Sequence, residues 1–245
     1  MIILNLLGTL FYYFTFGMFM ILYTPVCFLV WIVTTPFDKL RRINHKMNSL
    51  VGFLMMFLNP FWRTKIHGLE NVDRNETYVI TPNHLSLTDI CILASTGLDL
   101  KWISKKEISY IPTLGWMMLM GKDILLDRKD PKSQFSMMRK SEYYLNEGVS
   151  IAIFPEGTRS VSGELGKFRD GAALLAKKTN RKVLPVCNYG NNHAMPKKGF
   201  IWNKKVEMNM YFLPPIFPSE YKTKELSNLI KDSIQKKTDE LNSLK

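Results

Sequence analysis

Cysteine is scarce in this sequence, and the few cysteines follow no known pattern. The chain of 245 residues contains only Cys27, Cys91 and Cys187, and no two of them form a CxxC sequence. This arrangement excludes a small disulfide scaffold and the usual zinc-binding sequences. It is consistent with a reducing compartment.

Several catalytic signatures are absent as well. There is no GxSxG sequence, which excludes the usual nucleophile elbow of esterases. Residues 115–122 resemble a P-loop but contain one residue too many, and Asp123 stands where a serine or threonine is needed. His45, His67 and His193 have no partner at metal-ligand spacing, so we expect no metal site.

Acidic residues are outnumbered by 33 lysines and arginines to 21, which gives a net charge of +12. Such a balance predicts an anionic partner: nucleic acid, an acidic membrane surface, or a phosphorylated or nucleotide-bearing substrate. Residues 101–140 hold nine basic and four acidic side chains, and residues 156–205 hold eleven and three. Either stretch can also be only a solvated face.

The first 37 residues lack any charged side chain. About 20 apolar residues suffice to cross a bilayer, so this run can span a membrane or lie deep in one leaflet. Pro25 is expected to kink or divide the helix. A secretory signal peptide fits poorly, because no basic residue precedes the run and no small-x-small cleavage site follows it.

A basic cluster of Lys39, Arg41, Arg42 and Lys46 comes next. Its position predicts an anchor to anionic lipid on the cytoplasmic side. The second uncharged stretch, residues 47–62, is too short for a comfortable span and favours an interfacial helix; a buried core helix is the alternative. We therefore predict membrane-anchoring helices over residues 1–62, with a catalytic domain over residues 63–245 on the cytoplasmic face.

Strand-like and helical patterns alternate in the remainder of the chain. Strands are expected at 76–81, 98–104, 123–126, 149–154, 183–187 and 206–213, and helices at 86–96, 133–146, 171–178 and 222–244. This order predicts a single α/β domain with a largely parallel or mixed sheet flanked by helices. No internal repeat or linker interrupts it.

Residues 83–89 (NHLSLTD) follow a predicted strand and open a predicted helix. On one continuous helix His84 and Asp89 would diverge by about 140°, so they can meet only if His84 lies in the preceding loop. Ser86 fits the N-cap position, which places Asp89 over the helix start. The carboxylate would then orient the imidazole to take a proton from an alcohol. N-capping beside an incidental histidine is the simpler alternative.

Residues 154–160 (FPEGTRS) form the second candidate motif. Gly157 permits a tight turn after a buried strand, so that backbone N–H groups can approach a ligand. Arg159 supplies a planar donor that suits phosphate. A surface turn with a Glu–Arg ion pair explains the same residues without a ligand.

Taken in order, these motifs resemble the glycerophospholipid acyltransferases, and specifically the 1-acylglycerol-3-phosphate (lysophosphatidic acid) acyltransferase family. Residues 83–89 match its NHxxxxD box, and residues 154–160 match its FPEGTRS box. The block between them matches at Lys105, Glu107, Pro112, Gly115, Gly121 and Arg128, and residues 183–186 match the downstream box. Ile108 stands where leucine is more usual. The match covers roughly residues 65–215.

The resemblance implies an enzyme that moves a fatty acyl group from acyl-CoA or acyl-carrier protein to the sn-2 hydroxyl of lysophosphatidic acid. His84 would be the general base, oriented by Asp89. The residues expected to bind the glycerol-phosphate end are Lys105, Arg128, Glu156, Gly157, Thr158 and Arg159. The family implies membrane association and no metal or prosthetic group.

Two alternatives remain at this level. The first is a lysophospholipid acyltransferase or transacylase that acts on a different headgroup. The second is a non-catalytic basic protein of the membrane surface, which would have no need of His84 and Asp89. Nucleic acid is not expected as a partner, because the basic residues form no known readout motif.

Overall fold

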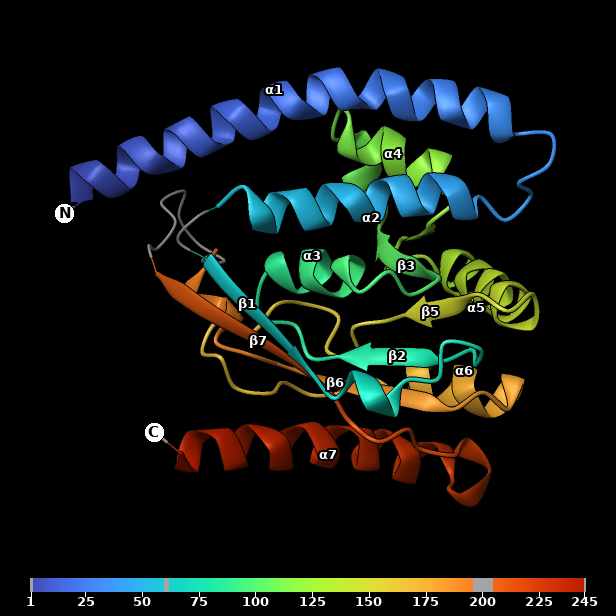
Figure 1. Ribbon diagram of the computed structural model, residues 1–245. Helices are drawn as coiled ribbons and strands as arrows, with labels where there is room; N and C mark the ends of the chain where they lie inside the picture. The colour runs from blue at the N-terminus through green and yellow to red at the C-terminus, as the bar shows by residue number, and fades with distance from the viewer. Residues whose placement is uncertain (1, 60–61, 196–204, 245) are drawn as a thin grey trace.

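A computed structural model describes residues 2–59, 62–195 and 205–244, with a seven-stranded sheet at the centre (Figure 1). The strands are β1 (Trp62–His67), β2 (Val79–Pro82), β3 (Leu100–Lys105), β4 (Ile124–Leu126), β5 (Ser150–Ala152), β6 (Val183–Tyr189) and β7 (Val206–Phe212). Their order is β1-β7-β6-β2-β5-β3-β4. Strands β6, β2, β5, β3 and β4 are parallel, whereas β7 runs antiparallel to β6 and parallel to β1. The expected α/β domain with a mixed sheet is confirmed.

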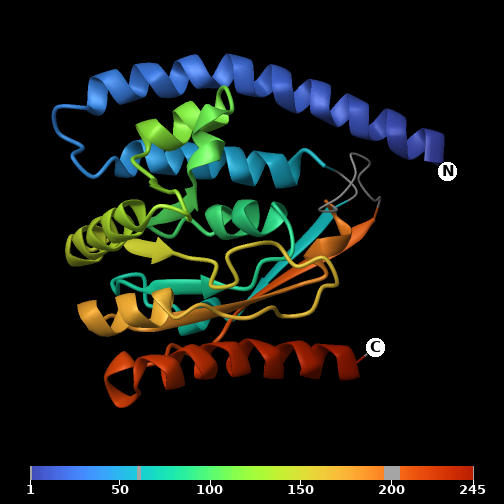
Figure 2. The same cartoon turned by 180° about the vertical axis from the view of Figure 1, so that it is seen from behind.

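Helices cover both sides of this sheet. They are α1 (Ile2–Thr34), α2 (Arg42–Phe57), α3 (Thr88–Ser95), α4 (Leu114–Met120), α5 (Pro131–Asn146), α6 (Gly171–Thr179) and α7 (Thr223–Ser243). On one side α3, α2 and α1 follow one another outward, and α7 covers the opposite side (Figures 1 and 2). The molecule is therefore layered, with α1 and α7 as its outermost helices.

The predicted elements after residue 75 are all present, with ends shifted by a few residues. Local chemistry explains such agreement: α5 begins with Pro131, and the Asp130 carboxylate accepts the backbone N–H groups of Lys132 and Ser133 at 3.0 and 3.2 Å. Strand β1 was not predicted. It lies at the sheet edge, and because only Trp62 of its residues is buried, it lacks the alternation of a half-buried strand.

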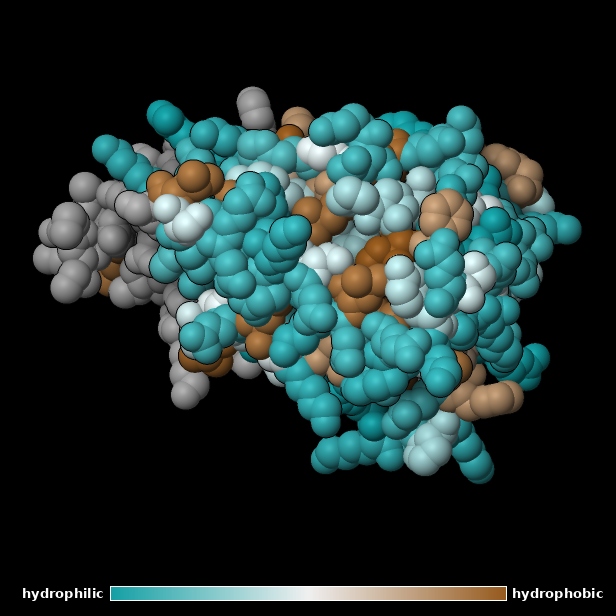
Figure 3. All heavy atoms as spheres, turned by 90° about the horizontal axis from the view of Figure 1, so that it is seen from below, coloured by the Kyte–Doolittle hydropathy of each residue, from teal (hydrophilic) through white to brown (hydrophobic). Residues whose placement is uncertain are grey.

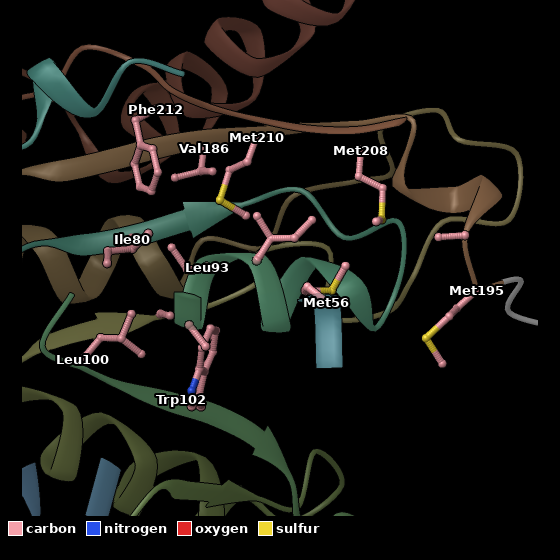
Figure 4. Close-up of a cluster of buried hydrophobic side chains, with 14 of the residues drawn as sticks. Met56, Ile80, Leu93, Leu100, Trp102, Val186, Met195, Met208, Met210 and Phe212 are labelled. Atoms are coloured by element: carbon pink, nitrogen blue, oxygen red, sulfur yellow. The ribbon is translucent and has the colours of Figure 1, made fainter. Parts of the chain in front are cut away.

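Two apolar clusters pack against the opposite faces of the sheet. Adjacent residues of β2 show the division, since Ile80 belongs to the cluster beneath α3 and Val79 to the cluster facing α6 and α7. Figure 4 shows the first cluster, where side chains of β2, β3, β6 and β7 meet Leu93 of α3 and Met56 of α2. Helix α2 thus shares a core with the sheet.

Helix α1 is long and largely exposed. Within Leu6–Thr34 the most apolar stretch of 18 residues has a mean hydropathy of 2.2, and only 17% of that stretch is buried. It is the single helix of the described residues that is long and apolar enough to cross a membrane. The helix continues through Pro25 as one curved element, so the expected division does not occur (Figure 1). Proline removes one backbone hydrogen bond, and the turns on either side retain theirs.

Helix α2 packs tightly on α3 through Gly52. A Cβ atom added to Gly52 would lie 3.1 Å from Ala94 Cβ and 3.2 Å from Cys91 Cα, so this glycine sets the distance between the helices. Val51 is also buried, whereas Phe53 is half-exposed. The helix therefore combines a core face with an outer face. The predicted domain boundary at residue 62 stays a prediction. In the structure this boundary falls between α2 and the elements with which α2 shares a core.

The basic cluster after α1 does not face lipid as a whole. Arg41 is 6% exposed and its guanidinium lies 5.7 Å from the centre of the Trp31 ring. Arg42 pairs with Asp99 at 2.9 Å and donates to the Glu147 carbonyl. The expectation that both arginines bind anionic lipid is therefore corrected: Arg41 packs against α1, and Arg42 attaches the start of α2 to the domain.

Lys101 strengthens the same attachment from inside the domain. Its side chain is fully buried, and Nζ donates to the carbonyls of Gly121 and Arg41 at 2.6 and 3.3 Å. Burial lowers the pKa of Lys101 to about 8. A buried ammonium needs such acceptors, so Lys101 joins β3 to the chain before α2 and the chain after α4.

We expect Gly52→Val to lower the free energy of unfolding by about 1–3 kcal/mol, because the added methyl groups force α2 away from α3. Gly17→Val is the matched control, since nothing lies within 4 Å of a Cβ atom added to Gly17 of α1. Thermal unfolding of both variants in detergent micelles provides the measurement. Equal losses in the two variants would show that helix propensity, and not the α2–α3 contact, causes the effect.

Candidate active site

The two candidate motifs meet at one edge of the sheet. His84 follows β2, Lys105 ends β3, Arg128 follows β4 and Phe154 follows β5. These strands are parallel, so their carboxyl ends lie at the same edge, where α/β proteins bind ligands. The residues line a groove of about 500 Å³. The topology therefore gathers residues that are far apart in the sequence.

His84 and Asp89 form a hydrogen-bonded pair in this groove. His84 Nδ1 lies 2.9 Å from Asp89 Oδ2, and the imidazole stacks on the Phe154 ring with centroids 4.0 Å apart. The predicted contact is present, with His84 in the loop. Helix α3 begins at Thr88, which puts its N-cap at Leu87, one residue after the predicted Ser86, and the Ser86 hydroxyl accepts the Thr88 N–H at 3.4 Å. The pair leaves Nε2 of His84 as the nitrogen that can act on a ligand.

The Asp89 carboxylate is fully buried and holds the loop around it. Oδ2 accepts the backbone N–H groups of Leu85 and Ser86 at 2.7 and 2.8 Å, in addition to His84. Oδ1 accepts a hydrogen bond from Asn191 Nδ2 at 2.8 Å. These donors stabilise an ionised carboxylate, which orients the imidazole through Nδ1.

A network of asparagines supports the pair from the neighbouring strand. Asn188 at the end of β6 exchanges hydrogen bonds with Asn83: its N–H donates to Asn83 Oδ1 at 2.6 Å, and its Nδ2 donates to the Asn83 carbonyl at 2.7 Å. Asn191 Nδ2 lies 3.4 Å from Asn188 Oδ1. Asn188 and Asn191 were not among the predicted site residues. The sequence signal for these two asparagines was weak, because they are marked only as polar residues that follow a buried strand.

Glu156 joins two loops beside the groove. Its side chain is 8% exposed, Oε1 accepts the His84 N–H at 2.8 Å, and Oε2 accepts the Gly166 N–H at 3.0 Å. Burial raises the pKa of Glu156, and these two N–H groups oppose the rise. The expected role of Glu156 in substrate binding stays a prediction. Its oxygens hold two loops together, and Glu156 lies next to the groove, where it lines a neighbouring hollow with Thr158, Arg159 and Arg169.

Cationic side chains surround one part of the groove. Lys105, Arg128, Arg159 and Arg169 all line it, together with Gly157 and Thr158. Gly157 adopts φ +70°, and a Cβ added to it would lie 3.4 Å from Arg169 Nε and 3.8 Å from Arg128 Cζ. Burial and the Arg169 charge lower the pKa of Arg128. Two guanidinium groups held against one turn favour an anionic ligand.

Arg169 was not singled out by the sequence analysis. It was counted only in the basic excess of residues 156–205, and nothing in its local sequence marks it. Its backbone N–H donates to the Pro155 carbonyl at 3.0 Å, and this bond returns the chain to the turn at Gly157. Tertiary structure alone places its guanidinium beside Arg128.

Apolar side chains line the other part of the groove. They include Leu87, Ile90, Trp102, Ile108 and Met137, which come from four different elements and the loop before α3. An apolar wall beside a cationic wall suits an amphiphile with a charged end and a hydrocarbon end. Within the described residues, no three His, Cys, Asp or Glu side chains are placed to hold a metal ion.

Ser86 and Cys91, which lie close to His84 in the sequence, are not placed as activated nucleophiles. Ser86 is fully buried and its Oγ lies 3.4 Å from the Met195 carbonyl. Burial raises the pKa of Cys91 to about 12, and its Sγ contacts Met55 of α2. A thiol with such a pKa stays protonated at neutral pH.

A family model described as Acyltransferase matches residues 63–189, which include every residue of the groove. The chain belongs to the acyltransferase family. Relatives with that name confirm the finer resemblance to 1-acylglycerol-3-phosphate acyltransferases seen in the sequence.

Individual relatives agree. The chain is 40% identical over 162 residues to 1-acyl-sn-glycerol-3-phosphate acyltransferase BAT2 of Brassica napus, covering 65% of this chain and 46% of that protein. It is 30% identical to the 1-acyl-sn-glycerol-3-phosphate acyltransferase of Borreliella burgdorferi, covering 70% of each. The crystal structure of the Thermotoga maritima enzyme PlsC superposes with a TM-score of 0.83 at 25% identity, over 98% of this chain and 97% of that one. The chain spans under half the length of the plant protein.

We expect Asn191→Ala to lower the turnover of acyl transfer by up to about 100-fold, because Asp89 and its imidazole lose a positioning contact. Asn191→Asp should be more impaired, since a second carboxylate would face Asp89 Oδ1 and shift the pH profile of kcat. Asn192→Ala is the matched control. An Asn191→Asp enzyme with the wild-type pH profile would contradict this role.

Proposed function

We propose that this protein transfers a fatty acyl group from an acyl thioester to the sn-2 hydroxyl of 1-acyl-glycerol-3-phosphate, giving phosphatidic acid. The 2.9 Å contact between His84 and the buried Asp89 carries the proposal, because it supplies an oriented base in a groove with cationic and apolar walls. The names of the relatives support the same reaction.

In the first step, His84 Nε2 removes the proton of the acceptor hydroxyl as its oxygen attacks the thioester carbonyl carbon. Nδ1 donates its hydrogen to Asp89, so Nε2 is the unprotonated nitrogen. The buried carboxylate stabilises the imidazolium that forms. Stacking on Phe154 holds the ring plane during this transfer.

In the second step, the tetrahedral oxyanion collapses. The carbon–sulfur bond breaks, the new ester remains on the acceptor, and the thiolate takes up a proton from the imidazolium. His84 returns to its neutral form, so the cycle closes without a change in the protein. Transfer is direct, since neither Ser86 nor Cys91 is activated as a nucleophile.

The cationic wall binds the phosphate of the acceptor. Arg128, Arg159 and Arg169 provide planar donors near the turn at Gly157, and Lys105 adds positive charge. The apolar wall takes hydrocarbon. Acyl-CoA or acyl-carrier protein serves as the co-substrate, and no metal or prosthetic group takes part.

The exposed helix α1 inserts into the membrane in which the acceptor is dissolved. Its apolar side chains are exposed over most of its length, from Leu6 to Val33. The catalytic domain lies on the cytoplasmic face, since the basic residues after α1 are retained on that side.

We expect His84→Ala to abolish acyl transfer almost completely while the protein stays folded. Asp89→Asn should lower turnover by roughly 10⁴-fold, because the imidazole loses its orienting carboxylate. The assay uses purified protein, labelled acyl-CoA and a panel of lysophospholipids, so that the headgroup preference is measured at once.

His67→Ala serves as the control, because His67 pairs with Asn209 away from the groove. Near-normal turnover in folded His84→Ala protein would overturn the mechanism. Preference for a lysophospholipid with another headgroup would retain the mechanism and replace the acceptor.

We expect Arg159→Lys to raise the KM for lysophosphatidic acid by about tenfold, with a smaller effect on the KM for the thioester. A guanidinium forms two parallel bonds to a phosphate, and lysine supplies only a point charge. Arg63→Lys on the exposed surface of β1 is the matched control. A defect confined to the thioester titration would assign the turn at Gly157 to the donor.

A further inference from the structure

The segment between β3 and β4 carries no charge over residues 108–121. It comprises the end of a short 3-10 helix (Lys106–Tyr110), a turn and α4. Its apolar side chains are unusually exposed: Tyr110 71%, Trp116 54%, Leu119 52%, Ile111 49% and Leu114 43%. A contiguous set of this kind on the surface of a domain marks an interaction site.

The other face of α4 holds these side chains in a fixed orientation. Met117 and Met120 are buried in a cluster with Met20 and Cys27 of α1 and Val51 of α2. Gly115 is the second residue of α4, and a Cβ added to it would lie 2.2 Å from the Ser109 carbonyl oxygen. The outer face of α4 is thus rigidly presented beside α1.

This surface lies on the same side of the molecule as α1. Figures 1 and 2 both show α4 at the level of α1 and α2, far from α7. The opposite side, formed around α7, is predominantly hydrophilic (Figure 3). The exposed apolar surface of α4 therefore continues that of α1.

Basic residues border the uncharged segment. Lys105 and Lys106 precede it together with Glu107, and Lys122 follows it before Asp123. Lys122 also lines a groove of about 780 Å³ with Arg139 and Lys140, next to Leu119. Apolar side chains bordered by lysine and arginine are the pattern of segments that enter an anionic membrane interface.

From these observations we infer that α4 and the turn before it form a second membrane-contacting surface, which inserts into an anionic phospholipid interface beside α1. The inference rests on the proposed function for the insertion of α1. It also explains how the acceptor reaches the groove, because Ile108 and Lys105 belong both to the groove and to the border of this segment. A lipid can then pass from the membrane to His84 without crossing water.

The direct test measures quenching of tryptophan fluorescence by lipids brominated on their acyl chains. The full-length protein is bound to vesicles of phosphatidylglycerol and phosphatidylcholine, and the wild type is compared with Trp116→Phe. The difference between the wild-type and Trp116→Phe emission is the fluorescence of Trp116. We expect the brominated lipids to quench this part strongly. A double variant, Trp116→Phe with Phe217→Trp, moves the reporter to an exposed position before α7, where we expect no quenching.

Unquenched Trp116 in vesicle-bound protein would overturn the inference and leave the anchoring by α1 intact. Failure of the whole protein to sediment with vesicles would overturn both membrane contacts. Neither result depends on acyl transfer, which is assayed separately in detergent micelles. The failure of the inference and of the proposed reaction are therefore distinguishable.

A kinetic test uses Trp116→Ser, with Phe217→Ser as the matched control. We expect the apparent KM for long-chain lysophosphatidic acid in vesicles to rise about fivefold to tenfold in Trp116→Ser, because an apolar membrane contact is lost. The KM for a short-chain, monomeric acceptor should be unchanged. Equal effects on both acceptors would place Trp116 in the groove and overturn the membrane role.

Discussion

The structure of the site depends on one buried carboxylate. Asp89 accepts hydrogen bonds from the loop that carries His84, from the imidazole itself and from Asn191 after β6. An unpaired charge at this depth would be very costly, so the surrounding chain must supply donors. The same donors place the imidazole, which means that the stability of the loop and the orientation of the base have a common cause.

The groove follows from the parallel strands. Their carboxyl ends bring the loops after β2, β3, β4 and β5 to one edge. Each loop contributes a different side chain to the groove. Glu156 shows how the loops are joined: its two oxygens bind N–H groups on both sides of the turn. The carboxylates of Asp89 and Glu156 are already occupied by N–H donors.

The layered arrangement relates this groove to a membrane. Helices α1, α2 and α4 share a small apolar cluster, and α2 and α3 touch closely at Gly52. Arg41, Arg42 and Lys101 add polar attachments across the same boundary. The helical layer is thus part of the domain, and its outer apolar surface has a defined position relative to the groove.

Local patterns in the sequence were enough to predict most strands and helices, the uncharged first helix, and the meeting of His84 with Asp89, because each depends on neighbouring residues. They could not reveal β1, whose partner β7 is distant in the chain and whose side chains are mostly exposed. Nor could they show that Arg41 is buried or that the Glu156 carboxylate accepts N–H groups from two loops. Asn191 and Arg169 gain their roles only when strands and loops from distant parts of the chain converge, since a side chain's partners across a sheet edge are set by tertiary packing and not by its neighbours in sequence.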